Sequence, residues 1–418
     1  MDQQQLALSP YRVLDLTEGE CLLGGRMMGD LGADVIQIEK PGGSPSRSRE
    51  PFYKDIPDPK KSLFWFSFCL NKRSITLNIE TVDGQDLFRR LVASAHFIFE
   101  SFEPGYLDSL GLGYQSLSQI NPGIIMASIT PFGQIGPKAH YKWTELIGWA
   151  SSGTLNSSGD PDRAPSVPNI PIVGQQGAMA AVLGALTAHW HRRITGEGQH
   201  VDISIQEVME WNTLNGIQWW DCQHVEVPRV GWGMPISPKT FMPHGFPCKD
   251  GYAHFPMSAG SLWLLKATRE LHKWMVEDGM EADWLKDYDW ANLDYGKFQK
   301  QEDLVPYLEP VENFLATKTK AELWQAAIKR RTLTGPVRDF KDNFEDPHLR
   351  DPGFWVDIKH PELNNDVITY PGSCFKLSKS PGSFRKAPLI GEHNQDIYEG
   401  ELGLSKQQMT FLRSNRVI

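Results

Sequence analysis

The chain has 418 residues, which is enough for two domains that each bury a hydrophobic core. Apolar residues make up 40% of it and charged residues 22%, a balance typical of globular proteins that fold in water. The net charge of −9 argues against a general nucleic-acid-binding protein, because phosphate backbones are bound by basic surfaces.

Targeting and membrane signals are not evident in the sequence. Residues 1–9 contain no basic stretch followed by an apolar one, so no secretory signal is expected. The longest run of small and apolar residues, 177–188, is too short to span a bilayer. The five cysteines occur without a CxxC spacing, which favours reduced thiols over a disulfide framework or a zinc site. We therefore expect a cytoplasmic protein with no metal, no membrane segment and no nucleic-acid partner.

The first third of the chain alternates between strand-like and helix-like patterns. A helix is predicted up to Asp30, and another from Asp83 to Ala95, with Asp83 as its N-cap. This alternation predicts an α/β fold with a parallel, doubly wound sheet. No GxGxxG follows the first strand, so nothing indicates an NAD site there. The strands are predicted at 13–16, 35–38, 75–77, 97–99 and 124–127.

A long helix of small residues is predicted over 175–193. Gly177, Ala181 and Ala185 recur at four-residue spacing and so share one face of this helix. Small side chains let another segment approach closely, so we expect this face to be buried against a neighbour. A turn at 195–198 and a strand at 201–205 follow.

The composition changes after the predicted strand. Residues 219–247 are rich in Trp, Gly and Pro, which predicts a loop-rich passage into a second domain. That domain would extend from 252 to 331 and end in a helix over 320–329. Two further strands are predicted at 356–360 and 367–370.

Short motifs along the whole chain resemble those of the class III coenzyme A (CoA) transferases, the CaiB/BaiF family that includes formyl-CoA transferases. Each motif alone is weak, but together they occur in the family's order. The motifs are Val13–Thr17, Asp30–Ile36, Ile38–Gly42, Asn71–Leu77, Gly111–Tyr114, Phe132–Pro137, Thr195–Val201 and Ala387–Asn394.

The resemblance implies a particular architecture. A large Rossmann-like domain would be built from both chain ends, 1–220 and 335–418, and residues 221–334 would form a linker and a smaller inserted domain. Two chains of this family thread through each other as an interlocked dimer. The substrates would be CoA thioesters, with no covalently bound cofactor.

The resemblance also shows a loss. Family members carry a nucleophilic aspartate at the start of the long small-residue helix, where it forms a mixed anhydride and then an enzyme thioester. Counting back from Gly198 along an ungapped helix places that position at Gly174. Glycine has no side chain, so the covalent mechanism is not available there, and no carboxylate occurs between Arg163 and Thr195 to replace it by a shift in register.

Residues at the family's CoA-contacting positions are partly kept. The resemblance assigns Lys40, Leu77, Phe102 and Lys142 to a vestigial CoA-binding site. Three other positions have lost the usual cation, because the family commonly has lysine or arginine where this chain has Glu80, Glu103 and Ser109. CoA carries phosphates, whose binding favours lysine and arginine, so these changes weaken the expected CoA site.

These features lead to a functional hypothesis. Some transferases of this family pair a chain that carries the aspartate with a related chain that lacks it, and this sequence resembles the second type. The resemblance implies a non-catalytic subunit whose partner is an aspartate-bearing homologue. The assembly would move CoA from succinyl-CoA to an aromatic dicarboxylate such as benzylsuccinate, a step of anaerobic toluene degradation.

Two alternatives remain open. The chain could act alone as an acyl-CoA isomerase, lyase or transferase that uses other residues, which turnover of a thioester by the purified chain would reveal. It could instead be a binding or regulatory protein that keeps the fold and has no catalytic partner. A neighbouring gene for an aspartate-bearing homologue would favour the subunit hypothesis over this last one.

Overall fold

The computed structural model describes residues 6–237, 240–257, 261–292, 295–351 and 353–418. The chain divides into two compact units. The large unit contains the residues up to Thr154, Asn169–Leu214 and Pro347–Ile418, and the small unit contains Leu155–Pro168 and Asn215–Asp346. Both halves of the sequence therefore contribute to the large unit.

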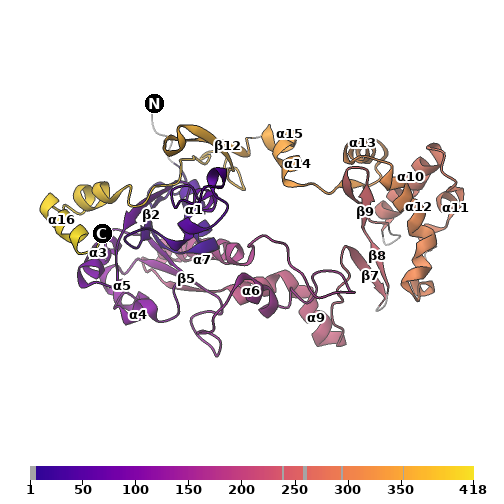
Figure 1. Ribbon diagram of the computed structural model, residues 1–418. Coiled ribbons are helices and arrows are strands. Elements are labelled where there is room, and N and C mark those ends of the chain that lie inside the picture. The colour runs from indigo at the N-terminus through magenta and orange to yellow at the C-terminus, as the bar shows by residue number, and fades with distance from the viewer. Residues whose placement is uncertain (1–5, 238–239, 258–260, 293–294, 352) are drawn as a thin grey trace. The chain divides into compact units, whose positions relative to one another are not determined.

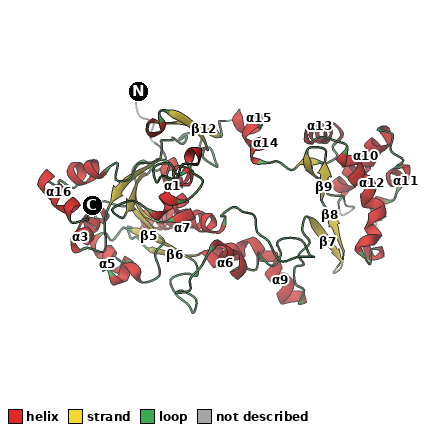
Figure 2. Ribbon diagram, in the orientation of Figure 1, coloured by secondary structure: helices red, strands yellow, loops and turns green. Residues whose placement is uncertain are grey.

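A six-stranded parallel sheet forms the centre of the large unit (Figure 2), as the sequence predicted. The inner strands β4 and β5 are buried along their whole length and read as mostly apolar runs, whereas the edge strand β6 alternates between exposed and more buried residues over most of its length. The strand order β3-β2-β1-β4-β5-β6 reverses between β1 and β4, and a crevice opens at the carboxyl ends of strands at such a point. The strands are β1 (Arg12–Leu16), β2 (Asp34–Glu39), β3 (Lys72–Thr76), β4 (Phe97–Glu100), β5 (Ile125–Thr130) and β6 (His200–Ser204).

Helices cover both faces of this sheet. The core on one face includes residues of α1 (Leu22–Asp30), α7 (Val173–Thr195) and α8 (Ile205–Glu210). The core on the other face includes residues of α3 (Val82–Val92), α5 (Tyr114–Ile120) and α16 (Lys406–Ser414). The remaining helices of this unit are α2 (Leu63–Phe68), α4 (Tyr106–Ser109), α6 (Glu145–Ser151) and α15 (Pro347–Arg350).

The predicted N-cap of α3 was wrong. Thr81, and not Asp83, has the extended backbone of an N-cap, and its side chain accepts the backbone N–H of Gly84 at 3.1 Å. Asp83 lies in the first turn instead, where its charge favours the positive helix end.

The predicted small-residue face of α7 is confirmed. Its glycine and alanine residues at 177, 181 and 185 are buried, and Gly177 lies so close to Ile205 that a Cβ there would approach the isoleucine Cγ1 to 2.8 Å. The opposite side of the helix is also apolar but exposed. We call its members, Met179, Leu183, Trp190 and Ile194, the exposed stripe of α7.

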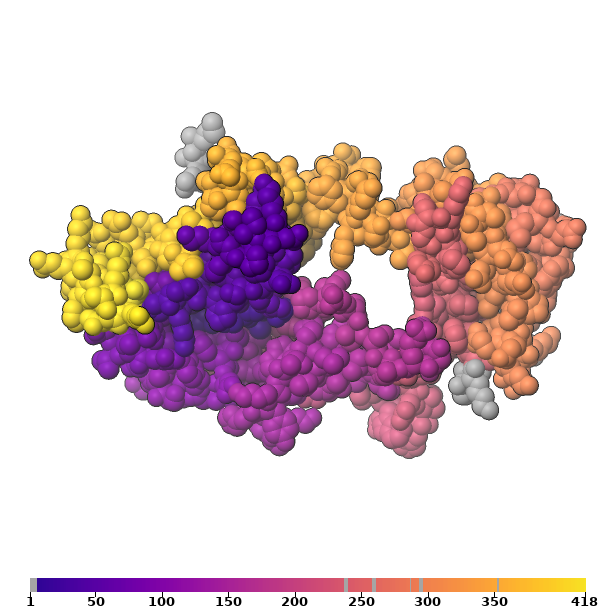
Figure 3. All heavy atoms as spheres, in the orientation of Figure 1, coloured from indigo at the N-terminus to yellow at the C-terminus, as the bar shows by residue number. Residues whose placement is uncertain are grey.

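The C-terminal part of the chain packs on the N-terminal sheet (Figures 1 and 3). The antiparallel hairpin of β12 (Trp355–His360) and β13 (Asp366–Pro371) packs on α2, and α16 lies beside α3. The backbone N–H of Thr76 donates to Asn394 Oδ1 at 2.9 Å, and the Tyr398 hydroxyl donates to the Thr76 carbonyl at 2.8 Å. A π-helical turn at Gln395–Glu401 carries this tyrosine.

The small unit has its own core, which includes Trp290 and Phe314. The sequence predicted loops over 219–247, but this passage contains a helix and parts of two antiparallel sheets. Its proline and glycine residues lie in short strands there rather than in loops alone. The elements are α9 (Leu214–Gln223), which leads into the unit, β7 (Gly233–Ser237), β8 (Thr240–Pro243), β9 (Gly245–Cys248), β10 (Gly251–His254), α10 (Leu262–Glu277), α11 (Asp283–Asp287), α12 (Val305–Ala316), α13 (Lys320–Arg330), β11 (Gly335–Pro336) and α14 (Phe340–Glu345).

Candidate functional site

A cavity of about 230 Å³ lies at the carboxyl ends of the central strands. Parallel sheets place ligands at this edge, so the cavity lies where the topology predicts a site. Lys40, Leu77 and Phe102, three of the four residues assigned to CoA binding from the sequence, line it together. Lys40 and Leu77 come directly after β2 and β3, and Phe102 comes shortly after β4, which explains how residues far apart in the sequence meet. The other lining residues are Leu16, Glu18, Ile38, Glu39, Pro45, Ile79 and Tyr106.

An open cleft of about 470 Å³ shares Lys40, Phe102 and Tyr106 with this cavity. Lys40 Nζ lies 2.8 Å from Glu80 Oε1, and the Tyr106 hydroxyl donates to the same oxygen at 2.9 Å. These two contacts lower the pKa of Glu80, so its carboxylate is charged at neutral pH. The positive charge of Lys40 is therefore already opposed by a residue of the same chain.

Lys142, the fourth assigned residue, does not line the cavity and lies in the exposed connection between β5 and α6. Its ammonium pairs with Glu103, which lines the open cleft. The hydrogen bond from Lys142 lowers the pKa of Glu103, so this carboxylate is charged as well. Both lysines assigned to CoA thus face a carboxylate at a position where the family commonly has a cation.

Gly174 is the second residue of α7 and is buried. A Cβ atom built on it would lie 2.7 Å from the Cβ of Glu20, 3.4 Å from its Cγ and 3.6 Å from its Oε2. Carbon atoms without a bond between them do not approach to 2.7 Å, so the side chain of Glu20 fills the space next to this glycine. Glu145 lies at the same helix end, where its Oε1 accepts the backbone N–H of Val173 at 2.7 Å.

Glu20 belongs to η1 (Gly19–Cys21), the turn that follows β1 and packs on α7. Its carboxylate lies 2.5 Å from Arg49 Nη2, and only 15% of its side chain is exposed. Arg49 is held in turn by the ring of Phe64, whose centroid is 4.1 Å from the guanidinium carbon. The Ser62 hydroxyl donates to the Arg49 carbonyl at 2.7 Å. Arg49 therefore reaches Glu20 from a fixed backbone.

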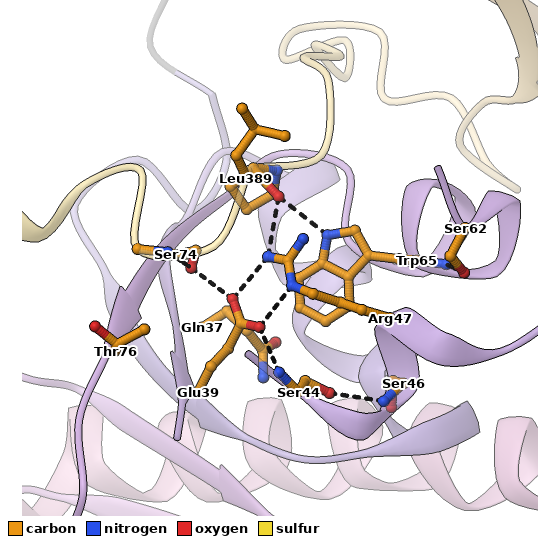
Figure 4. Close-up of polar contacts among 12 residues, drawn as sticks. Gln37, Glu39, Ser44, Ser46, Arg47, Ser62, Trp65, Ser74, Thr76 and Leu389 are labelled. Carbon is orange, nitrogen blue, oxygen red and sulfur yellow. Dashed lines mark hydrogen bonds and ion pairs between the residues drawn. The ribbon is translucent and has the colours of Figure 1, made fainter. Parts of the chain in front are cut away.

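A buried ion pair anchors the loop that carries Arg49, and Figure 4 shows this pair. Arg47 donates to both oxygens of Glu39 at 2.7 Å, and neither side chain is exposed by more than 1%. The Arg47 guanidinium lies 3.7 Å from the centroid of the Trp65 ring, and both side chains donate to the Pro388 carbonyl, at 3.1 and 3.0 Å. Removing either partner would leave the other charge buried and uncompensated, so the loss of Arg47 or Glu39 alone is expected to be strongly destabilising.

Two further carboxyl groups lie at this edge, a half-buried one on Glu18 and a buried one on Glu100. Burial raises the pKa of Glu18, although the hydroxyls of Ser44 and Ser46 donate to its Oε2. Burial also raises the pKa of Glu100 to about 7, against the hydrogen bond from the backbone N–H of Phe102 at 2.8 Å. The edge therefore carries carboxyl groups that the sequence interpretation did not single out.

One feature of the sequence does point to the arginine residues at this edge. The polar stretch 44–51 lies a few residues after β2, beyond the strand end where ligands bind, and it contains both Arg47 and Arg49. What no pattern could reveal is the pairing, because Arg49 and Glu20 are 29 residues apart.

The described part of the chain contains neither a metal-binding cluster nor a membrane-spanning helix. Within it, no group of three or more His, Cys, Asp or Glu side chains is arranged to hold a metal ion. None of its helices is both long enough and apolar enough to cross a bilayer.

Comparison with known proteins identifies the family. A model described as CoA-transferase family III matches residues 8–394. The succinyl-CoA:(R)-benzylsuccinate CoA-transferase subunit BbsE of Thauera aromatica is 32% identical over 395 residues, or 93% of each chain. A formyl-CoA:oxalate CoA-transferase of Streptomyces avermitilis is 31% identical over 435 residues, with 99% of each chain covered.

The fold agrees with that result. The crystal structure of a CAIB/BAIF family protein from Brucella suis superposes with a TM-score of 0.79 at 24% identity, covering 95% of this chain and 100% of that one. Because the family model spans most of the sequence and both relatives align along almost their whole length, this chain belongs to CoA-transferase family III.

Proposed function

We propose that this chain is a non-catalytic subunit of a two-subunit class III CoA-transferase. The observation that carries the proposal is the start of α7, where Gly174 offers no nucleophile and Glu20 fills the adjacent space. A chain that keeps the family fold but has no aspartate at this position needs the carboxylate of another chain for transfer. The partner is an aspartate-bearing homologue.

The edge of the sheet that carries the cavity and the open cleft, which we call the ligand edge, supports the same assignment. The cavity formed by Lys40, Leu77 and Phe102 has the apolar walls that an aromatic or aliphatic part of CoA requires. The phosphates of CoA need cations, and both Lys40 and Lys142 already hold a carboxylate of this chain. We therefore assign these four residues to a vestigial CoA site, with no part in catalysis.

The substrate assignment follows from one relative. BbsE is named as a subunit of a succinyl-CoA:(R)-benzylsuccinate CoA-transferase. By analogy, the assembly containing this chain moves CoA from succinyl-CoA to an aromatic dicarboxylate such as benzylsuccinate, in the cytoplasm and within anaerobic toluene degradation.

An exposed apolar surface supports the partner assignment. Trp190 and Leu183 in the exposed stripe of α7 are 71% and 70% exposed, and Trp211, just after α8, is 77% exposed. Large apolar side chains in one stripe are unfavourable in water and mark interaction surfaces. The interlocked dimer of this family would cover them, with residues 1–220 and 335–418 as the large domain and 221–334 as the linker and small domain.

Coexpression tests the proposal. This chain and an aspartate-bearing homologue from the same genome should purify as a stable heteromer that transfers CoA from succinyl-CoA to benzylsuccinate. Replacing the homologue's aspartate with asparagine should abolish transfer, whereas Gly174→Ala in this chain should leave activity within a few-fold. Transfer by this chain alone, as a homodimer with an acyl adduct on its own carboxylate, would contradict the proposal.

A further inference from the structure

The space beside Gly174 is filled by one particular side chain. The three atoms nearest to a Cβ at this position are the Cβ, Cγ and Oε2 of Glu20. The 2.7 Å approach involves the Cβ of Glu20, which is fixed to the backbone and cannot rotate away as the end of a flexible side chain can. Any side chain at 174 therefore requires η1 or the start of α7 to move.

The carboxylate of Glu20 is also clamped. Arg49 holds it at 2.5 Å in a pair whose acid is 15% exposed, and a charge-assisted bond of this length is stronger than a neutral one. Arg49 has its own anchors in the Phe64 ring and the Ser62 hydroxyl. A carboxylate paired with arginine is a weak nucleophile, because the ion pair stabilises the negative charge that the carboxylate loses when its oxygen bonds to a carbonyl carbon.

We propose that Glu20, clamped by Arg49, is the resident occupant of the vacated nucleophile position and excludes acyl groups from it. Glu20 is thereby a specificity-determining residue: it keeps CoA thioesters from reacting in this chain and confines transfer to the partner. The inference rests on the proposed function for its meaning, but the contact itself is a property of this chain alone.

The steric exclusion by Glu20 is tested by a double-mutant cycle on the full chain, in which the thermal unfolding midpoint is measured. Gly174→Ala should lower the midpoint by roughly 2–8 °C, the range expected for overpacking. In the Glu20→Gly background, which removes the Cβ of residue 20, the same substitution should lower it by less than half as much. In the Glu20→Ala background, which keeps that Cβ, most of the loss should remain.

Gly177→Ala is the matched control. It lies one turn further along α7 and would meet Ile205 at 2.8 Å, so its cost is also steric but involves no contact with Glu20. Its effect on the unfolding midpoint should be the same with and without Glu20→Gly. If Gly174→Ala costs as much in the Glu20→Gly background as in the wild type, the occupant assignment is wrong.

The clamp is tested without relying on stability. A water-soluble carbodiimide with glycine ethyl ester modifies accessible carboxylates, and peptide mass spectrometry gives the rate at each one. Glu20 should react far more slowly than Glu103, whose side chain is 72% exposed. Arg49→Gln should raise the rate at Glu20 several-fold and leave that at Glu103 unchanged. Equal rates at Glu20 in both proteins would overturn the role of Arg49.

The last arm asks whether Glu20 reacts as a nucleophile. The wild-type chain is incubated with succinyl-CoA and then with hydroxylamine, which converts an acylated carboxylate to a hydroxamate. Glu20 should remain unmodified. A hydroxamate on Glu20 would show that its carboxylate attacks the thioester carbonyl with release of the CoA thiolate. The proposal that Glu20 excludes acyl groups would then be refuted. A failed steric cycle with a working heteromer would refute only this inference, and the proposed function would stand.

Discussion

Two acidic residues set the charge of the ligand edge. Glu80 and Glu103 each neutralise a lysine that would otherwise attract phosphate, and both are exposed enough that water screens the pairs. Exposed ion pairs of this kind contribute little to stability. Their effect is on ligand charge instead, because a phosphate that approaches either lysine meets a carboxylate at the same time.

The double variant Glu80→Gln/Glu103→Gln should bind CoA more tightly than the wild-type chain. Each removed carboxylate is expected to improve affinity roughly two- to fivefold, the factor that corresponds to an exposed charge pair. Isothermal titration with CoA at low and high salt measures this, and the gain should shrink at high salt. Glu312→Gln, an exposed change in the small unit, is the control. An affinity gain equal to that of the control would remove the charge argument.

Glu100 makes stability depend on pH. Its carboxyl ionises near 4.5 without perturbation, and burial raises its pKa to about 7 in the folded chain. Between these values the folded state binds more protons than the unfolded state, so stability falls as pH rises through this window and is level above it. The free energy of unfolding should lose roughly 3 kcal/mol from this group between pH 4.5 and 8.

Glu100→Gln isolates that contribution, because glutamine does not titrate. Urea unfolding at pH 5 and pH 8 should show a smaller loss of stability with rising pH in the variant than in the wild type. Glu103→Gln serves as the comparison, since its parent carboxyl is exposed and its pKa is lowered rather than raised. A pH dependence in Glu100→Gln that matches the wild type would rule out Glu100 as its source.

At the scale of single residues, the sequence located the site only in part. Lys40, Leu77 and Phe102 were assigned to CoA binding from the family resemblance, and they line one cavity because each lies at or near the end of a strand of the parallel sheet. Gly174 was recognised from its place in a family motif. The role of Glu20 could not be predicted, because its meaning depends on a contact between a turn and a helix start that no local pattern encodes.

Among the elements, α7 differs most from an ordinary covering helix. Its buried small residues let it pack closely on β5 and α8, whereas its exposed stripe of large apolar side chains has no cover within the described part of this chain. The two faces explain why the helix has almost no net amphipathic character in sequence, although only one face lies in the core.

Leu183→Glu should prevent assembly with the homologue while the chain itself stays folded. Leu183 is 70% exposed, so the charge costs nothing in the separate chain, but burial against a partner would leave it unpaired. Size-exclusion chromatography of the coexpressed pair and circular dichroism of this chain alone measure the two effects. Glu309→Gln, an exposed change in the small unit, should change neither result. An intact heteromer with Leu183→Glu would place the interface elsewhere.

The elements themselves were largely predictable, and the exceptions have physical reasons. The inner strands β4 and β5 are buried, mostly apolar segments, and the exposed edge strand β6 shows the alternation of a half-buried strand, so the sequence pattern and the burial agree in both cases. The N-cap of α3 was misassigned because Thr81 and Asp83 are both good capping residues, and backbone geometry alone decides between them. The strands β7, β8 and β9 are short and rich in Gly, Pro and Met, so no alternation marks them.

On the scale of the whole molecule, the large unit joins segments that are far apart in the sequence. The parallel sheet was predicted, and the family resemblance implied that both chain ends would contribute to it. The domain limits at 220 and 335 and the interlocked dimer stay predictions, to be tested on the assembled heteromer. Nothing in the sequence of either end by itself indicates that they meet, because the contacts depend on burial rather than on a shared pattern.

The bonds between Thr76 and the segment at Asn394 and Tyr398 have a consequence for synthesis. They join residues 318 and 322 positions apart, so one face of the sheet waits for its cover while a ribosome adds the intervening residues. At the usual rates of elongation this interval is roughly 15–60 s. During it, Ile75, Leu87 and other core residues of that face have no C-terminal segment over them. The nascent chain therefore exposes this apolar face to water until translation has passed the small unit and the C-terminal segment can cover it.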